Sequence, residues 1–205
     1  MASSVASIAL TVLLSNVIFL VHANDPDITS DFLVPEGVML DANFFTFTGL
    51  KQNLWGAPKD APFKVTKASL LEFPALNGQS VSYAALQYGP GGINPPHTHP
   101  RSAELLIVLQ GALKVGLVDS TKNKLFTQIL QTGDMFVFPK GMVHFQANVD
   151  PRYPAVALSA FGSANAGTVS LPKTLFGSGI DQDVLAKSFK TDAQTIQSLV
   201  SANTA

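Results

Sequence analysis

Cysteine is absent from this 205-residue chain. The sequence therefore excludes disulfide bonds and thiolate metal sites, and the fold must be stabilised by packing and assembly. The Asn-x-Ser/Thr pattern for N-glycosylation is also missing. The length of the chain suits one domain with a full hydrophobic core.

Charged residues make up only 13% of the chain, with 13 Lys and Arg against 14 Asp and Glu. No basic stripe is available to neutralise phosphates, which argues against a nucleic-acid partner or an anionic membrane surface. A chain with 46% hydrophobic residues and so little charge is typical of proteins that cover apolar surface in subunit contacts. We therefore expect a homo-oligomer.

The N-terminal segment carries the features of a leader. Residues 1–23 contain no Lys, Arg, Asp or Glu, and residues 8–14 and 17–21 supply an apolar core before the small and aliphatic positions of Val21-His22-Ala23. This pattern predicts a signal peptide over residues 1–23, a secreted mature chain that begins near Asn24, and no membrane contact after cleavage. An uncleaved membrane anchor is the alternative, although the apolar run is short for a span of about 20 residues.

The middle of the chain is predicted to be all-β. Short strand-like runs alternate with turn residues, and the expected strands cover residues 64–73, 80–88, 104–109, 112–118, 125–130, 135–138, 143–149 and 155–161. Strands of this length and spacing predict a single antiparallel barrel or sandwich over residues 63–170. Residues 105–109 are all apolar, which is typical of a strand buried on both faces, one of them against a partner.

The two flanking segments differ from this middle region. Residues 24–62 form an N-terminal arm without a clear period, in which the aromatic residues of 44–47 and Trp55 are expected to be packing anchors. Residues 171–205 form a C-terminal extension with helices predicted over 181–189 and 192–202. The second helix opens on the capping-box pattern Thr191-x-x-Gln194. We expect these helices to pack on a neighbouring subunit rather than to carry chemistry.

All histidines beyond the leader lie in one metal-ligand pattern, together with one carboxylate. His97 and His99 are two residues apart, so both can point to the same face of a strand, and Glu104 and His144 complete the set. A single His-x-His is weak evidence for a metal, but here no histidine lies elsewhere in the mature chain. Three imidazoles and one carboxylate suit Mn, Fe or Ni better than a structural Zn site. Ligand types alone leave Mn, Fe and Zn open.

Two runs around these ligands resemble the paired motifs of the cupin superfamily. The first motif is matched by Gly92, His97, His99, Glu104 and Gly111, and the second by Gly133, Asp134, Pro139, Gly141, His144 and Asn148. Residues 90–101, with the sequence PGGINPPHTHPR, resemble the germin box of plant germin-like proteins. The resemblance implies a cupin antiparallel β-barrel (jelly roll) with C-terminal α-helices, and one manganese held by His97, His99, Glu104 and His144. It also implies a hexamer built as a trimer of dimers, and secretion to the apoplast, the extracellular matrix and the cell wall.

The activities that the resemblance implies are superoxide dismutation, which produces hydrogen peroxide, and oxalate oxidation. The sequence departs from the family pattern at two positions. Leu33 stands where the family has a cysteine, so the family's N-terminal disulfide is missing. Ala84 stands where oxalate oxidases have an Asn that holds oxalate, and an alanine donates no hydrogen bond to an anion. Oxalate oxidase is therefore the less favoured activity.

A manganese superoxide dismutase is the leading hypothesis, because superoxide is a small substrate that needs only an exchangeable metal position. Asn94 is the candidate catalytic residue that hydrogen-bonds metal-bound water or substrate; alternatively, it is a turn residue before two prolines. Arg101 is expected to steer anions or to form an ordinary surface pair, and Asp134 to close a turn. The residues expected to line the pocket, or else to belong to the core, are Leu109, Met135, Phe136 and Phe145.

Two other classes of function stay open. The first is a non-enzymatic wall protein in which the metal stiffens the barrel and the cavity binds a small organic or auxin-like acid. The second is a metal-dependent hydrolase or phosphodiesterase, for which the sequence offers no general base apart from the metal ligands.

Overall fold

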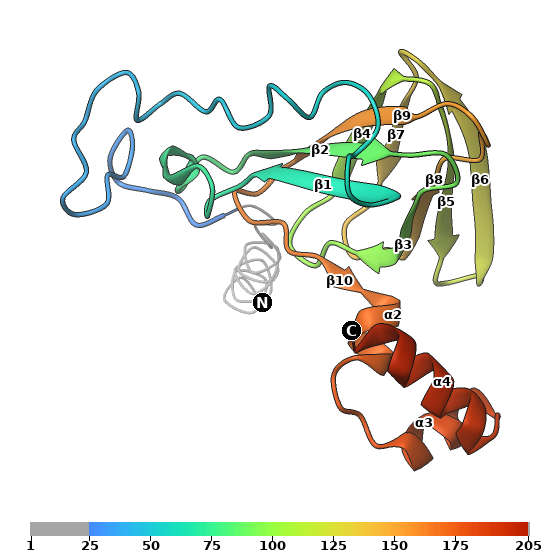
Figure 1. Ribbon diagram of the computed structural model, residues 1–205. Coiled ribbons are helices and arrows are strands. Elements are labelled where there is room, and N and C mark those ends of the chain that lie inside the picture. The colour runs from blue at the N-terminus through green and yellow to red at the C-terminus, as the bar shows by residue number, and fades with distance from the viewer. Residues whose placement is uncertain (1–24, 205) are drawn as a thin grey trace, which may run out of the picture.

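The computed structural model describes residues 25–204, which form two antiparallel five-stranded sheets (Figure 1). The predicted signal peptide lies outside the described residues. The first sheet has the order β1 (Phe63–Ala68), β2 (Ser82–Tyr88), β9 (Ala155–Phe161), β4 (Glu104–Gln110) and β7 (Met135–Phe138). The second sheet has the order β10 (Val169–Ser170), β3 (Ile93–Thr98), β8 (His144–Ala147), β5 (Ala112–Asp119) and β6 (Lys124–Gln131). This architecture confirms the predicted all-β jelly roll.

The hydrophobic core lies between the two sheets, because alternate residues of each strand point inward. In β5, Leu113 and Val115 are fully buried while the intervening Lys114 is exposed. Both sheets contribute buried apolar side chains to one cluster: Leu86, Tyr88, Leu106, Val108, Leu113, Val115, Leu130, Phe138, Ala155 and Ala157.

Strand β4 differs from the prediction that it is buried on both faces. Leu106 and Val108 point into the core, whereas Leu105 on the outer face is 42% exposed in the single chain. Its neighbours on β7, Met135 and Val137, are exposed as well. Burial of this outer face by a partner subunit stays a prediction.

Strand β3 was not among the predicted strands, because Pro95 and Pro96 interrupt it. The structure accommodates them through a register shift between Asn94 and His97 in the pairing of β3 with β8. Such an irregularity lets a strand contain residues that cannot donate to the ladder. The strand predicted over 64–73 is also shorter, since β1 ends at Ala68 and a turn and the 3-10 helix η1 (Pro74–Leu76) follow.

The C-terminal extension contains α2 (Leu171–Phe176), α3 (Gln182–Phe189) and α4 (Ala193–Asn203). Helix α2 contacts β3 and β10 at the edge of the barrel, and α4 packs against both α2 and α3, which lies farther from the barrel (Figure 1). The short α2 was not predicted. Asp192 caps α4 by accepting from the backbone N–H of Thr195, so the capping residue is one position later than the predicted Thr191. Within residues 25–204 no helix has the length and apolar character needed to cross a bilayer.

The described part of the N-terminal arm, residues 25–62, consists of turns without a helix or strand. Some predicted anchors pack as expected, since Phe47 stacks on Phe73 with ring centroids 5.5 Å apart. Trp55 does not, because its side chain is 68% exposed. Instead the backbone carbonyl of Trp55 accepts a hydrogen bond from Gln87 on the outer face of β2.

Candidate metal centre

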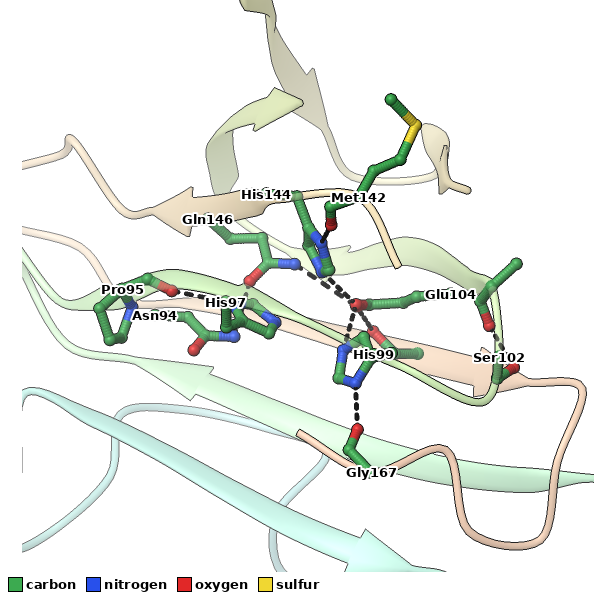
Figure 2. A network of polar contacts seen from close by, with 12 residues as sticks. Asn94, Pro95, His97, His99, Ser102, Glu104, Met142, His144, Gln146 and Gly167 are labelled. Atoms are coloured by element: carbon green, nitrogen blue, oxygen red, sulfur yellow. Dashed lines mark hydrogen bonds and ion pairs between the residues drawn. The ribbon is translucent and has the colours of Figure 1, made fainter. Parts of the chain in front are cut away.

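The four residues singled out by sequence converge inside the barrel, as Figure 2 shows. His97 lies on β3 directly opposite His144 on β8, His99 follows the end of β3, and Glu104 is the first residue of β4. All four side chains are buried, and their ligand-capable atoms lie within 4.8 Å of one another.

The backbone fixes which nitrogen of each imidazole faces the centre. The Nδ1 atoms of His97 and His144 lie 2.8 and 2.9 Å from the carbonyl oxygens of Pro95 and Met142, and that of His99 lies next to the carbonyl oxygen of Gly167. A carbonyl oxygen can only accept, so each Nδ1 carries the proton. In the neutral imidazole each Nε2 then carries a lone pair that is available to a metal, and a partner on the second nitrogen is the usual arrangement of ligating histidines.

Acceptor atoms crowd together at the point where these nitrogens meet. Glu104 Oε2 lies 3.0 Å from both His99 Nε2 and His144 Nε2. A carboxylate oxygen next to two nitrogen lone pairs is repulsive unless a proton or a cation lies between them. The donor set therefore fits a divalent cation.

The protonation states also suit metal binding. Burial alone would raise the pKa of Glu104, but contacts with His144 and His99 outweigh it and lower that pKa to about 2. Burial, followed by the charge of His144, lowers the pKa of His97 to about 4. Above about pH 4, Glu104 is thus ionised and His97 is neutral, which are the states that metal ligands require.

A second layer of polar groups holds Glu104, and it includes residues that sequence reasoning missed. Ser159 on β9 donates its hydroxyl to Glu104 Oε1, and Gln146 on β8 donates to the same oxygen at 3.4 Å. Asn94 donates to Gln146 Oε1 at 2.7 Å. The structure thus places Asn94 beside the centre, where it contacts Glu104 through Gln146. Gln146 was predictable, because it follows His144 by two residues on one strand and so shares its face.

A cavity of about 290 Å³ opens beside the cluster, and His97, His99, Glu104 and Asn94 line it. Leu109, Met135, Phe136 and Phe145 do not line this cavity, whose other walls come from β1, β2 and the segment 161–168. Phe136 packs against the hydrophobic core instead, which was the alternative expectation. Phe145 follows His144 directly and therefore points to the opposite face of β8, where it covers Gly116. The aromatic side chain that does contact the cluster is Phe138, whose ring stacks on that of His144 with centroids 4.3 Å apart.

Arg101 forms polar contacts with the cavity wall, in line with the ordinary pair that was the alternative to anion steering. Its Nε donates to the backbone oxygen of Asn165 at 2.6 Å, and its Nη2 donates to Asn165 Oδ1 at 2.9 Å. The guanidinium therefore fixes the segment whose Gly167 carbonyl orients His99. Asp134 closes its turn as predicted, since its carboxylate accepts from the backbone N–H of Gln131 at 2.8 Å.

Comparison with known proteins gives a consistent set of relatives. Residues 61–197 match the cupin family. The chain is 58% identical to germin-like protein 9-3 of Oryza sativa subsp. japonica, over 97% of this chain and 95% of the relative. It is 39% identical to germin-like protein subfamily 2 member 1 of Arabidopsis thaliana, over 95% of each chain.

Solved structures show the same fold. A structure of oxalate oxidase in complex with the substrate analogue glycolate superposes with a TM-score of 0.78 at 33% sequence identity, covering 88% of this chain and 98% of that chain.

Proposed function

The chain belongs to the germin-like proteins of the cupin family, and from this premise we propose that it is a secreted manganese protein with superoxide dismutase activity that produces hydrogen peroxide. The observation that carries the proposal is the buried group of three Nε2 lone pairs and one ionised carboxylate. Iron and zinc are the alternative metals that this donor set accepts.

His97, His99, Glu104 and His144 would hold the ion, each with its Nδ1 or second carboxylate oxygen bound by a neighbour. A redox-active ion such as manganese, when bound, supplies two oxidation states that can take an electron from one superoxide and return it to another. The protein keeps these ligands rigid and excludes bulk solvent from them.

Asn94 is the residue we assign to substrate or water on the cavity side. Its amide nitrogen donates to Gln146, and its carbonyl oxygen is the atom that we assign to accept a hydrogen bond from water or from a protonated product. The two protons that turn the reduced oxygen species into hydrogen peroxide have to come from solvent through the cavity. Asn94 therefore positions a proton donor rather than exchanging a proton itself, because an amide does not titrate in this range.

Removal and exchange of the metal test the dismutase proposal. Protein stripped by a chelator at acid pH is expected to lose superoxide dismutase activity, and reloading with Mn²⁺ is expected to restore it. Reloading with Zn²⁺ is the matched control, since zinc fills the same ligand set without changing oxidation state. Stripped protein that keeps full activity, or Mn-loaded protein without activity, would overturn the proposal.

A non-enzymatic role as a binding or structural protein of the wall is the second candidate, and the cavity beside the centre favours it. Oxalate oxidation is less favoured, although a similar structure is an oxalate oxidase. Ala84 lines the cavity with a methyl group where a hydrogen-bond donor to oxalate would be needed.

Secretion to the apoplast and cell wall belongs to the same proposal, as does assembly into a hexamer built as a trimer of dimers. Support for assembly comes from apolar side chains that the single chain leaves exposed. On the outer face of the first sheet these include Leu105, Met135 and Val137, and on the C-terminal helices Val184 and Phe189.

Truncation tests the role of the C-terminal helices in assembly. Deletion of residues 181–205, which removes α3 and α4, is expected to lower the sedimentation mass from the full oligomer to a smaller species, because exposed apolar surface on these helices loses its partner. Metal content of the truncated protein serves as the control for an intact barrel. Sedimentation at the full oligomer mass, corrected for the deletion, would contradict this role.

A further inference from the structure

Strand β9 contains one polar residue, Ser159, among apolar ones. Its pairing partners on the neighbouring strands are Ala84 on β2 and Leu106 on β4, and its side chain is fully buried. A buried hydroxyl in such surroundings costs free energy unless it is hydrogen-bonded. The hydroxyl of Ser159 meets this need by donating to Glu104 Oε1, so the polar side chain serves the candidate metal centre rather than the core.

Strand register fixes the position of this hydroxyl relative to Glu104. Glu104 pairs with Phe161, which follows Ser159 by two residues on the same strand. Ser159 and Glu104 are therefore diagonal neighbours on one face of the sheet, about 7 Å apart at Cβ, a distance that the longer Glu side chain spans. Because β9 lies between β2 and β4 in the middle of its sheet, the backbone holds the donor rigidly.

The two carboxylate oxygens of Glu104 have different neighbours (Figure 2). Oε2 lies 3.0 Å from the Nε2 atoms of His99 and His144, where an ion would bind. Oε1 accepts from the hydroxyl of Ser159 and, at 3.4 Å, from Gln146. An ionised carboxylate can only accept, so Gln146 must turn its NH₂ group toward it. Donors of the protein therefore occupy Oε1, and Oε2 is the oxygen left for an ion.

We infer that Ser159 is a positioning residue that keeps Glu104 a one-oxygen ligand and raises the reduction potential of a bound redox-active ion. A hydroxyl that donates to a carboxylate forms a charge-assisted hydrogen bond and draws electron density from it. The carboxylate then donates less to the ion, which favours the reduced ion with its lower charge. An ion that takes an electron from one superoxide and returns it to another needs a potential between those of the two half-reactions. The inference rests on the proposed manganese centre.

A redox titration of the manganese-loaded full chain, with the wild type and Ser159→Ala compared, tests this inference. We expect the variant to bind one ion per chain and to shift the ratio of oxidised to reduced ion about tenfold, which lowers the midpoint potential by about 59 mV for one electron. Ser159→Thr keeps the hydroxyl and is expected to keep the wild-type potential. Ser82→Ala is the matched control, because Ser82 is a buried serine of β2 whose hydroxyl donates to the backbone oxygen of Ser163.

Crystal structures of the two loaded proteins add a measurement of position, with one oxygen of Glu104 on the ion in the wild type and Oε1 moved toward the ion in Ser159→Ala. An unchanged potential in Ser159→Ala, an equal shift in Ser82→Ala, or loss of the ion from folded Ser159→Ala would overturn the inference. Ser159→Cys, whose thiol is a weaker donor, is the second variant should Ser159→Ala fail to fold; a smaller decrease is expected, and no decrease overturns the inference.

Dismutase activity of the wild-type protein is measured in parallel, because neither the potential nor the ligand geometry depends on turnover. A wild-type protein that dismutes superoxide while Ser159→Ala keeps its potential refutes this inference alone. A shifted potential in a protein that does not dismute superoxide refutes only the proposed activity.

Discussion

Replacement of His144 by alanine is expected to abolish metal binding, with a loss of affinity of more than about 100-fold. The change removes one of three imidazole ligands and also leaves a buried space against the ring of Phe138, which stacks on His144. It also takes away one of the two groups that keep the pKa of Glu104 low. Metal per chain, measured by elemental analysis after dialysis, checks this prediction.

Thr98→Ala is the matched control for this experiment. Thr98 lies between His97 and His99 on β3 and points to the other face of the strand. The control protein is expected to bind one ion per chain like the wild type. If His144→Ala also keeps its full metal content while it remains folded, the ligand assignment is wrong.

Replacement of Gly92 by alanine is expected to lower the free energy of unfolding by about 3 kcal/mol. Gly92 directly precedes β3, the strand that carries His97. A Cβ at this position would lie 2.0 Å from the backbone oxygen of Pro62 and 3.0 Å from that of Gly89. Pro62 O cannot move away freely, because it accepts a hydrogen bond from the backbone N–H of Gly89. Denaturant unfolding of the metal-free protein measures the effect.

Gly91→Ala provides the comparison for this variant. The same methyl group is added at the neighbouring residue, where the backbone conformation rather than the surrounding space is the constraint. A Cβ at Gly91 meets nothing within 4 Å, but the backbone has a positive φ of 70°. The expected cost is therefore about 1 kcal/mol from backbone strain alone. A Gly91→Ala protein that is less stable than Gly92→Ala would contradict the steric account.

The cluster of His97, His99, Glu104 and His144 was predictable from sequence, because the chemistry and spacing of these residues are local. His97 and His99 lie two residues apart, and His144 is the first residue of β8, which follows a clear turn at residues 140–141. The β-strands with regular alternation, such as β5, were predictable for the same reason. Strand β3 was missed because its two prolines are local signals for a turn, and only the register shift opposite β8 shows how the strand tolerates them.

The cavity was not predictable, because its walls come from strands that are distant in sequence. Residues next to the ligands in sequence were expected to line it, yet immediate neighbours on a strand point to the opposite face, as Phe145 does. Ser159 donates a hydrogen bond to Glu104 from 55 residues away along the chain. No local sequence pattern predicts this contact. The role of Arg101 also depends on a distant segment, since its partner is Asn165.

The most direct test of the four-ligand centre is a crystal structure of the manganese-loaded protein with anomalous scattering recorded at the manganese edge. We expect one anomalous peak per chain, at about 2.0–2.3 Å from the Nε2 atoms of the three histidines and from a carboxylate oxygen of Glu104. A loaded crystal with no peak between these four side chains, or with its peak at another site, would contradict the account.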